Sequence, residues 1–258
     1  AADNAEPCMG LRVNLRRGNV AQYLARLQAA GIAAEAPGEV AIVLPHSLPV
    51  ERLPGFAQGE VSVQDWGAQQ AARFLDPPAD ARVLDACAAP GGKTAQLAER
   101  GDYDLVAMDV DEQRLQRVRD NLQRLGLTAK VICGDALQPD AGLGLFDRIL
   151  ADVPCSASGV VRRHPDLKWL RRASDLGALA RVQQQMLRAL WGRLKPGGRL
   201  LYVTCSVFRQ ENEEQIGAFL AVRPDARRLP LPDPAAAAVA LQSADRKSTR
   251  LNSSHGYI

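Results

Sequence analysis

From residue 81 onward, short apolar segments alternate with longer segments of helical periodicity. The apolar segments are ARVLDA (81–86), LVAMDV (105–110), AKVICG (129–134), RILADV (148–153) and RLLYVTC (199–205). Regular alternation of this kind favours a parallel β-sheet with helices on both faces. The clearest helices cover 111–125 and 178–194, and the turn KPGG follows the second. The sequence therefore predicts an α/β fold.

The first sixty residues do not follow this alternation. LRVN (11–14) and EVAIVL (39–44) have strand character, and Asn19 is suited to cap an amphipathic helix through Leu27. The turn residues of LPGFAQG (53–59) mark a boundary, after which Asp65 is expected to cap a helix over 66–75. We therefore expect a small α+β subdomain over residues 1–60 and a larger domain over 61–224.

Composition excludes several other classes of protein. The 258 residues are 47% hydrophobic, yet no apolar run approaches the ~18 residues of a membrane span. The five cysteines are scattered without a CxxC pair, which argues against a disulfide framework and against a zinc site, so no metal is predicted. The net charge of +3 is too small to identify a partner. We expect a soluble, cytoplasmic protein.

The last part of the chain, residues 225–258, has a biased composition and is predicted to be irregular. Its stretch DRKSTRLNSSH resembles the translation of a sequencing-adapter oligonucleotide. We therefore expect residues 245–258 not to belong to the natural sequence.

Three of the predicted strand ends carry residues suited to a nucleoside, because ligands of open parallel sheets bind at the carboxyl ends of the strands. DACAAPGGKT (85–94) lets the backbone approach a ligand closely, although any tight strand-to-helix turn needs glycine. Asp109 ends the second strand and follows Asp85 by 24 residues, the spacing along the chain expected of a carboxylate that binds a ribose. The alternative role is a helix cap, which Asp111 would serve better. Asp135 follows the third strand and is suited to an adenine amine or to a turn.

The fourth and fifth strand ends carry thiols. Asp152 and Cys155 flank Pro154, which stiffens the backbone, and Cys205 ends the neighbouring strand. A single cysteine at such a place is more often a packing residue, but two beside a nucleoside pocket indicate chemistry. A thiolate added to C6 of cytosine makes C5 nucleophilic enough to accept a methyl group, after which a second polar group must remove the C5 proton.

DACAAPGGK, DVPCSASG and VTCS, with RRHPDLKWLRR (162–172), resemble the bacterial 16S ribosomal RNA cytosine-5 methyltransferases of the RsmB/Sun type, in the NOL1/NOP2/Sun family. The resemblance covers residues 10–222. It implies a Rossmann-like class I S-adenosylmethionine-dependent methyltransferase sheet, with the small N-terminal α+β subdomain binding RNA. It also implies S-adenosyl-L-methionine as cofactor, and 16S ribosomal RNA, unassembled or partly assembled, as the partner of a monomer. Family members carry a further helical N-terminal domain, so we expect this chain to be a fragment.

The same resemblance implies a role for each motif. Cys205 would be the nucleophile that attacks C6, Cys155 would assist release of the methylated product, and Asp152 would lie between cofactor and target base. Asp109 would hold the ribose and Asp135 would face the adenine. The residues implied to bind the cofactor are Cys87, Ala88, Ala89, Pro90, Gly91, Gly92, Lys93, Asp109, Asp135 and Asp152.

The basic segment 162–172 places five Arg or Lys residues and one Trp immediately after the cysteine loop. This composition suits phosphate contacts and a stacking platform beside a flipped base, although a solvated charged face is the alternative. The predicted RNA-binding residues are Arg162, Arg163, Lys168, Trp169, Arg171 and Arg172.

Two other functions remain open at this point. A P-loop nucleotide hydrolase is one, because PGGKT resembles the end of GxxxxGK[ST] and RILAD resembles a strand that carries a magnesium ligand. However, position 87 is cysteine where that motif needs glycine, and Cys155 and Cys205 are left unexplained. A noncatalytic RNA-binding protein of the same fold is the other.

Overall fold

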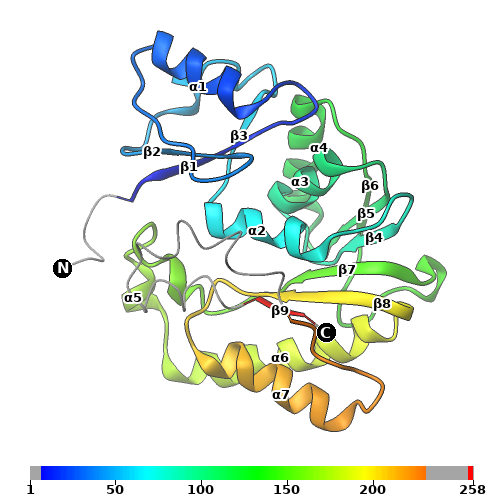
Figure 1. Cartoon of the computed structure of the whole chain (residues 1–258). Helices are drawn as coiled ribbons and strands as arrows, with labels where there is room; N and C mark the ends of the chain where they lie inside the picture. Colours follow the sequence, from blue (N-terminus) through cyan, green and yellow to red (C-terminus); the bar gives the residue numbers. More distant parts are fainter. Residues whose placement is uncertain (1–6, 231–254, 258) are drawn as a thin grey trace.

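The computed structural model describes residues 7–230 and 255–257 of the chain. Its centre is a six-stranded sheet with the order β6-β5-β4-β7-β8-β9 (Figure 1). The strands are β4 (Arg82–Asp85), β5 (Asp104–Asp109), β6 (Lys130–Cys133), β7 (Phe146–Asp152), β8 (Leu194–Val203) and β9 (His255–Tyr257). Strands β4 to β8 run parallel, and β9 pairs antiparallel with β8. The parallel α/β sheet expected from the sequence is thus confirmed.

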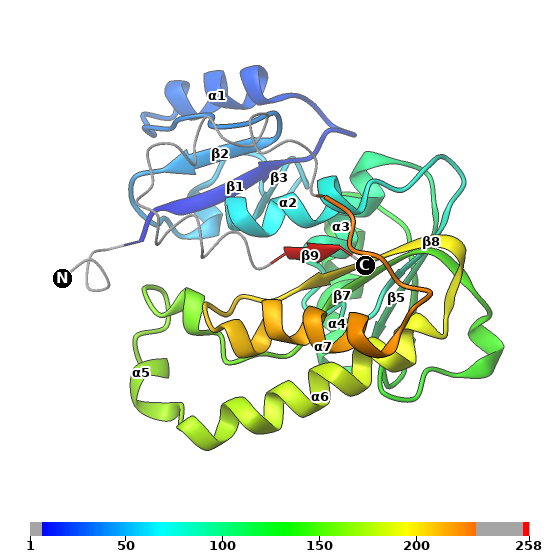
Figure 2. The same cartoon turned by 60° about the horizontal axis from the view of Figure 1, so that its bottom comes forward.

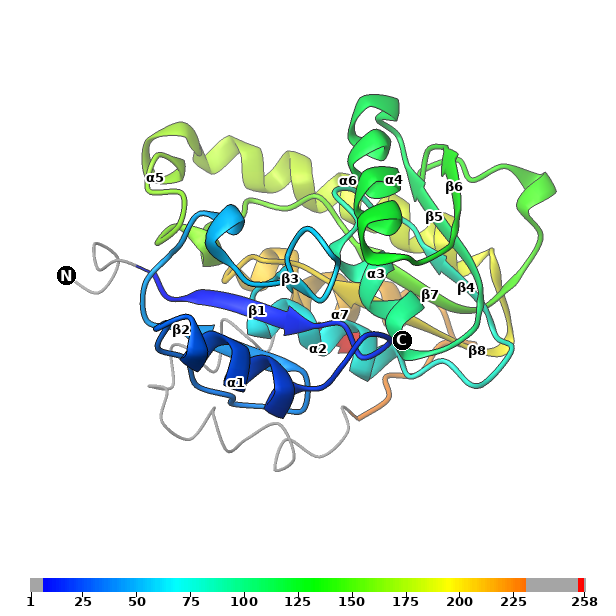
Figure 3. The same ribbon diagram turned by 90° about the horizontal axis from the view of Figure 1, so that it is seen from above.

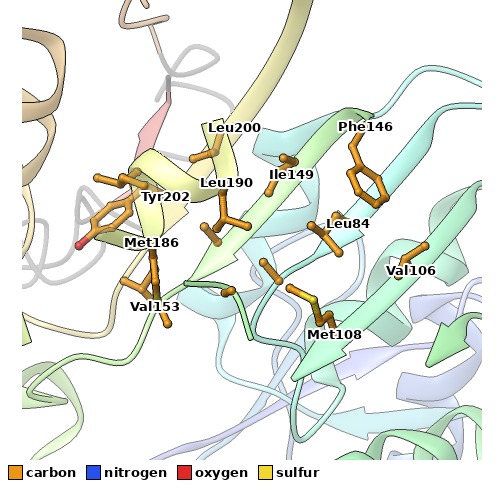
Figure 4. Packing of buried hydrophobic residues seen from close by; sticks show 14 of the residues in the cluster. Leu84, Val106, Met108, Phe146, Ile149, Val153, Met186, Leu190, Leu200 and Tyr202 are labelled. Atoms are coloured by element: carbon orange, nitrogen blue, oxygen red, sulfur yellow. The ribbon is translucent and has the colours of Figure 1, made fainter. Parts of the chain in front are cut away.

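Helices cover both faces of this sheet, with α2, α3 and α4 on one face and α6 and α7 on the other (Figure 1). Figure 2 shows α2 above the sheet and α6 and α7 below it. Their bounds are α2 (Trp66–Leu75), α3 (Gly92–Arg100), α4 (Glu112–Leu125), α5 (Leu167–Leu170), α6 (Ala173–Trp191) and α7 (Glu213–Val222). Successive strand residues point to opposite layers: Leu84 belongs to the same cluster as Met186 and Leu190 of α6 (Figure 4), whereas Val83 packs with Leu97 of α3. The central strands are therefore covered by helices on both faces, as is usual for parallel sheets.

The strand order creates one crevice. The chain continues from β4 to β5 on one side, whereas β7 lies on the other side of β4, so the order reverses between β4 and β7. Connections that leave two such strands in opposite directions open a crevice at their carboxyl ends. Asp85 ends β4, Asp152 ends β7, and Cys205 lies just beyond the end of β8. The motifs of the predicted site therefore meet at one edge of the sheet.

The N-terminal residues form a separate antiparallel sheet with the order β2-β1-β3, covered by α1 (Figure 3). Its elements are β1 (Met9–Val13), α1 (Val20–Ala29), β2 (Ala41–Leu44) and β3 (Val61–Val63). Asn19 caps α1 in a capping box, as predicted. The unit docks on the parallel domain through Arg12, which is buried and forms an ion pair with Glu99 of α3 at 2.8 Å. The expected small α+β subdomain is confirmed.

Some local expectations differ from the structure. Helix α6 ends at Trp191 and β8 begins at Leu194, so the KPGG segment lies inside the strand rather than in a turn. Gly197 has φ +77°, and the register between β7 and β8 shifts at their start, which is how the strand accommodates these residues. Strand β3 was not predicted, and β9 lies in the segment predicted to be irregular; most of 245–258 falls outside the described residues. Among the described helices, none combines the length and apolarity of a membrane span.

Candidate active site

Two cavities open at the carboxyl edge of the sheet and share a wall. The larger, of about 330 Å³, is bordered by Asp109 and Asp135. The smaller, of about 290 Å³, is bordered by Lys93 and by residues of the segment 162–172. Asp152 and Cys205 line both cavities. A ligand in one cavity would therefore meet a ligand in the other across this acid and this thiol.

The larger cavity is held together by a network around Asp109. This carboxylate is buried and accepts hydrogen bonds from the backbone nitrogens of Ala89 and Asp111, each at 3.1 Å. Arg114 lies 3.5 Å from Asp109 and donates to the carbonyl oxygen of Ala89 at 2.9 Å. Gly91 has φ +100°, and a Cβ there would come within 3.0 Å of the backbone of α4. The loop after β4 therefore packs closely against the end of β5.

The predicted cofactor-binding residues divide between the two cavities. The larger one is lined by Cys87, Ala89, Asp109, Asp135 and Asp152 of the predicted set, and also by Arg114 and Met186, which sequence reasoning missed. Ala88, Pro90, Gly91 and Gly92 belong to the loop and helix start beside it. Lys93 borders the smaller cavity instead. Burial raises the pKa of the Cys87 thiol, so this cysteine is neutral at physiological pH.

The shared wall carries an ion pair. Nζ of Lys93 lies 2.6 Å from Oδ2 of Asp152. Burial lowers the pKa of Lys93, but the charges of Asp152, Asp85 and Cys205 and the hydrogen bond to Asp152 together outweigh it, so the pKa is raised overall and the ammonium is retained. Behind the pair, burial raises the pKa of Asp85 to about 6, although the hydroxyl of Thr94 donates to this carboxyl at 2.6 Å.

The structure brings the two predicted cysteines together. Their sulfurs lie 3.3 Å apart, and the backbone nitrogen of Cys205 lies 3.4 Å from the sulfur of Cys155. The hydrogen bond from Cys155 lowers the pKa of Cys205 and correspondingly raises the pKa of Cys155. The ammonium of Lys93 lowers the pKa of Cys205 further, against burial and the charge of Asp152. Of the two thiols, Cys205 is therefore the one prepared to ionise.

The cysteine loops rest on a buried polar network that sequence reasoning missed. The short helix η5 (Arg209–Glu211) places the side chain of Glu211 beneath the loop that follows Cys155. Glu211 accepts hydrogen bonds from Ser156 and from Gln183 of α6. No pattern in the sequence links these three positions, because they come together only through the packing of α6 against the sheet.

The predicted RNA-binding residues occupy different environments. Arg162 and Arg163 line the smaller cavity, and Arg163 also forms an ion pair with Asp65 at 2.7 Å. Trp169 is 88% exposed on α5. Arg171 donates to the carbonyl oxygen of Ser156 at 2.9 Å, so it supports the cysteine loop. The remaining two, Lys168 and Arg172, are exposed.

The strand order reverses next to β4, and Asp109 at the end of β5 lines the larger cavity at the carboxyl edge of the sheet. This arrangement is the Rossmann-like fold of the class I methyltransferases. The chain belongs to the family described as 16S rRNA methyltransferase RsmB/F, which it matches over residues 72–254. Residues 1–51 match the ferredoxin-like domain of the RsmF/B-like methyltransferases. This membership excludes the P-loop alternative.

Curated relatives carry the name ribosomal RNA small subunit methyltransferase B. The protein from Vibrio cholerae serotype O1 is 54% identical over 231 residues, covering 88% of this chain and 53% of the relative. The protein from Klebsiella pneumoniae subsp. pneumoniae is 50% identical over 232 residues, covering 87% and 53%. The chain therefore spans about half the length of the curated relatives it matches.

Solved structures share the fold. A methyltransferase homolog protein from Pyrococcus horikoshii superposes with a TM-score of 0.79 at 32% identity, over 90% of this chain and 75% of that one. NSun6 from Pyrococcus horikoshii superposes with a TM-score of 0.81 at 21% identity, over 90% and 84%. The similarity extends across both the N-terminal unit and the parallel domain.

Proposed function

We propose that the chain is the catalytic part of an enzyme that transfers a methyl group from S-adenosyl-L-methionine to C5 of a cytosine in 16S ribosomal RNA. The observation that carries this proposal is the shared wall of the two cavities, where Asp152 and Cys205 face both. A methyl donor in the larger cavity and a flipped base in the smaller would meet at the sulfur of Cys205. We further propose that residues 61–224 contain the catalytic domain and that residues 1–60, which share the N-terminal sheet with β3 (Val61–Val63), contact RNA.

The larger cavity fits the cofactor in size and in chemistry. Its volume of about 330 Å³ is within the range of small-molecule sites. Asp109 and Asp135 offer acceptors to ribose hydroxyls and to an adenine amine, and Met186 and Val153 offer apolar surface to the base. When bound, the cofactor supplies an electrophilic methyl group. The three aspartates that line the cavity suit its positive charge.

Replacing Asp109 with Asn is expected to weaken cofactor binding. A charge-assisted hydrogen bond to a hydroxyl contributes about 1.5–3 kcal/mol, which corresponds to a roughly 10- to 100-fold higher Kd. Isothermal titration calorimetry with S-adenosylmethionine measures this change. Asp111→Asn is the matched control, because Asn still caps α4 and the side chain lies outside the cavity; an equal loss in both variants would contradict the assignment.

In the proposed reaction, the thiolate of Cys205 adds to C6 of the cytosine and a C–S bond forms. The Lys93–Asp152 pair borders the smaller cavity, where it can stabilise the charge that develops on the ring. The activated C5 would then accept the methyl group as the bond between this methyl and the cofactor's sulfur breaks, which would leave the cofactor as a neutral thioether. Lys93, Asp152 and Cys205 all line the smaller cavity, where the base would lie.

Product release requires loss of the C5 proton and cleavage of the bond between C6 and Cys205. At rest, the hydrogen bond to Cys205 is the main cause that raises the pKa of Cys155. Once the sulfur of Cys205 is bound to carbon it is a neutral thioether and no longer raises the pKa of Cys155 as a charged neighbour, so Cys155 can lose its proton to solvent. We propose that the Cys155 thiolate then removes the C5 proton, after which the C6–S bond breaks and the Cys205 thiolate is restored.

The double substitution Arg162→Ala and Arg163→Ala is expected to weaken RNA binding. Both side chains border the smaller cavity, and loss of two phosphate contacts should reduce the salt slope of log K by about 1.4 for single-stranded RNA. Fluorescence anisotropy at several salt concentrations measures the slope. Arg188→Ala on α6, which is exposed and borders neither cavity, is the control. An unchanged slope in the double variant would count against the assignment.

The activity itself is tested with radiolabelled methyl-S-adenosylmethionine and 16S ribosomal RNA, followed by digestion to nucleosides and mass spectrometry. The proposal predicts label in 5-methylcytidine. Label in a different nucleoside would refute the assignment to C5, and binding of RNA without any transfer would favour the noncatalytic alternative.

A further inference from the structure

A buried carboxylate lies beneath the cysteine loops and takes no part in the reaction described above. Glu211 is fully buried. Its carboxylate accepts hydrogen bonds from the backbone nitrogen of Ser156 at 2.8 Å, from the hydroxyl of Ser156 at 2.5 Å and from the amide of Gln183 at 3.0 Å. A buried carboxylate is stable only when such donors replace water, so its three partners define its position closely.

These hydrogen bonds hold the backbone on both sides of Cys155. Ser156 follows this cysteine and is bound directly by Glu211. Pro154 precedes it, and its carbonyl oxygen accepts a hydrogen bond at 3.0 Å from the same Gln183 amide that contacts Glu211. The peptide groups that flank the thiol are thus connected to one acid.

The network also reaches the second cysteine loop. The hydroxyl of Ser156 lies 3.1 Å from that of Ser206, which follows Cys205. The backbone nitrogen of Gly159 donates to the carbonyl oxygen of Cys205 at 2.8 Å. Cys205 is in addition held by β8, which ends two residues before it, whereas Cys155 lies in a loop three residues beyond β7. The placement of Cys155 therefore depends more on Glu211 than the placement of Cys205 does.

We propose that Glu211 is a positioning residue that holds Cys155 against Cys205 and thereby sets the rate of product release. The inference rests on the proposed function, in which Cys155 acts after the methyl group has been transferred. Loosening Cys155 should leave addition of Cys205 to the base largely intact, because β8 still holds the nucleophile. Elimination should slow, because the proton acceptor is no longer held beside C5.

The test separates the two steps in Glu211→Ala. Formation and decay of the covalent protein–RNA complex are followed by rapid quenching and denaturing gels, with RNA and S-adenosylmethionine present. At a pH above the Cys205 transition, where the thiolate is fully formed in both proteins, we expect the rate of formation to stay within about threefold of that of the unsubstituted protein. The rate of decay should fall by about tenfold or more, as for displacement of a general base. Glu211→Gln should restore most of the decay rate, because its amide oxygen still accepts from Ser156 and Gln183. Decay at the unaltered rate, or equal losses in formation and decay, would overturn the proposal.

The matched control is Glu213→Gln, since Glu213 is exposed two residues further on and pairs with Arg209. If Glu211→Ala does not fold, Gln183→Met removes the link to Pro154 and should slow decay by about threefold; no change there would overturn the proposal as well. The unsubstituted protein and Cys155→Ala are measured in the same experiment. If the unsubstituted protein releases methylated RNA, Cys155→Ala accumulates the covalent complex and Glu211→Ala releases product at the normal rate, only this inference fails and the proposed function stands.

A second measurement needs no RNA. The pH dependence of iodoacetamide alkylation at Cys205 reports the pKa that Cys155 helps to lower. Displacing Cys155 in Glu211→Ala should move this profile to higher pH, and Glu213→Gln should leave it in place. An unchanged profile in Glu211→Ala would mean that Cys155 has not moved and would contradict the positioning role.

Discussion

Cys205→Ala is expected to abolish methyl transfer to cytosine, with a loss on the order of 10³-fold or more, because C5 is not activated without the thiolate addition. Cys205 lines both cavities, and of the two cysteines it is the one whose pKa is lowered. No covalent protein–RNA complex should form in this variant. Transfer from radiolabelled S-adenosylmethionine and denaturing gels measure both effects.

Cofactor binding provides the control for this first variant. The Kd for S-adenosylmethionine should remain within about threefold, since the larger cavity loses one wall atom only. Cys133→Ala, which removes an exposed cysteine outside the shared wall, should retain activity. If Cys205→Ala keeps appreciable methyl transfer, the nucleophile has been assigned to the wrong residue.

Cys155→Ala is expected to have the opposite effect on the covalent complex. Addition through Cys205 should still occur, but removal of the C5 proton should slow by about 10²-fold or more, as for loss of a general base. The complex should therefore accumulate to nearly one per protein, and turnover after the first cycle should fall to the slow rate of release. Intact-protein mass spectrometry measures the amount of complex.

The same variant should also shift the pH dependence of complex formation. Cys155 donates the hydrogen bond that lowers the pKa of Cys205, so its removal should move formation to higher pH. The double variant Cys155→Ala with Cys205→Ala should form no complex. A complex that persists in the double variant would point to another nucleophile, and normal turnover in Cys155→Ala would remove this residue from the mechanism.

Much of the fold follows from the sequence because it depends on local periodicity. The alternation after residue 81 predicts the parallel sheet, and Asn19 and Asp65 cap the helices at which the sequence places them. The predicted start of β8 was wrong for a physical reason. A KPGG segment normally follows the end of a helix as a turn, but here it pairs with β7 as part of the strand, with a shift of register. Pairing of this kind depends on the neighbouring strand, which local patterns do not describe.

The candidate site was predictable to the extent that its residues follow strand ends. Parallel strands bring their carboxyl ends to one edge, so the convergence of Asp152, Cys155 and Cys205 follows from the topology. Contacts that depend on helix packing were not predictable. The pairing of Lys93 with Asp152 and the buried position of Glu211 belong to this second kind.

RNA in which cytosine is replaced with 5-fluorocytosine tests directly whether Cys205 adds to the base before methyl transfer. Fluorine at C5 cannot leave as a proton does, so a covalent adduct formed before methyl transfer cannot be released afterwards. Incubation with S-adenosylmethionine, digestion and peptide mass spectrometry then locate the attached nucleotide. If Cys205 is the nucleophile, a cofactor-dependent complex of one protein per RNA forms, with the nucleotide on the sulfur of Cys205. Attachment at Cys155, or no complex under conditions in which ordinary RNA is methylated, would contradict this assignment.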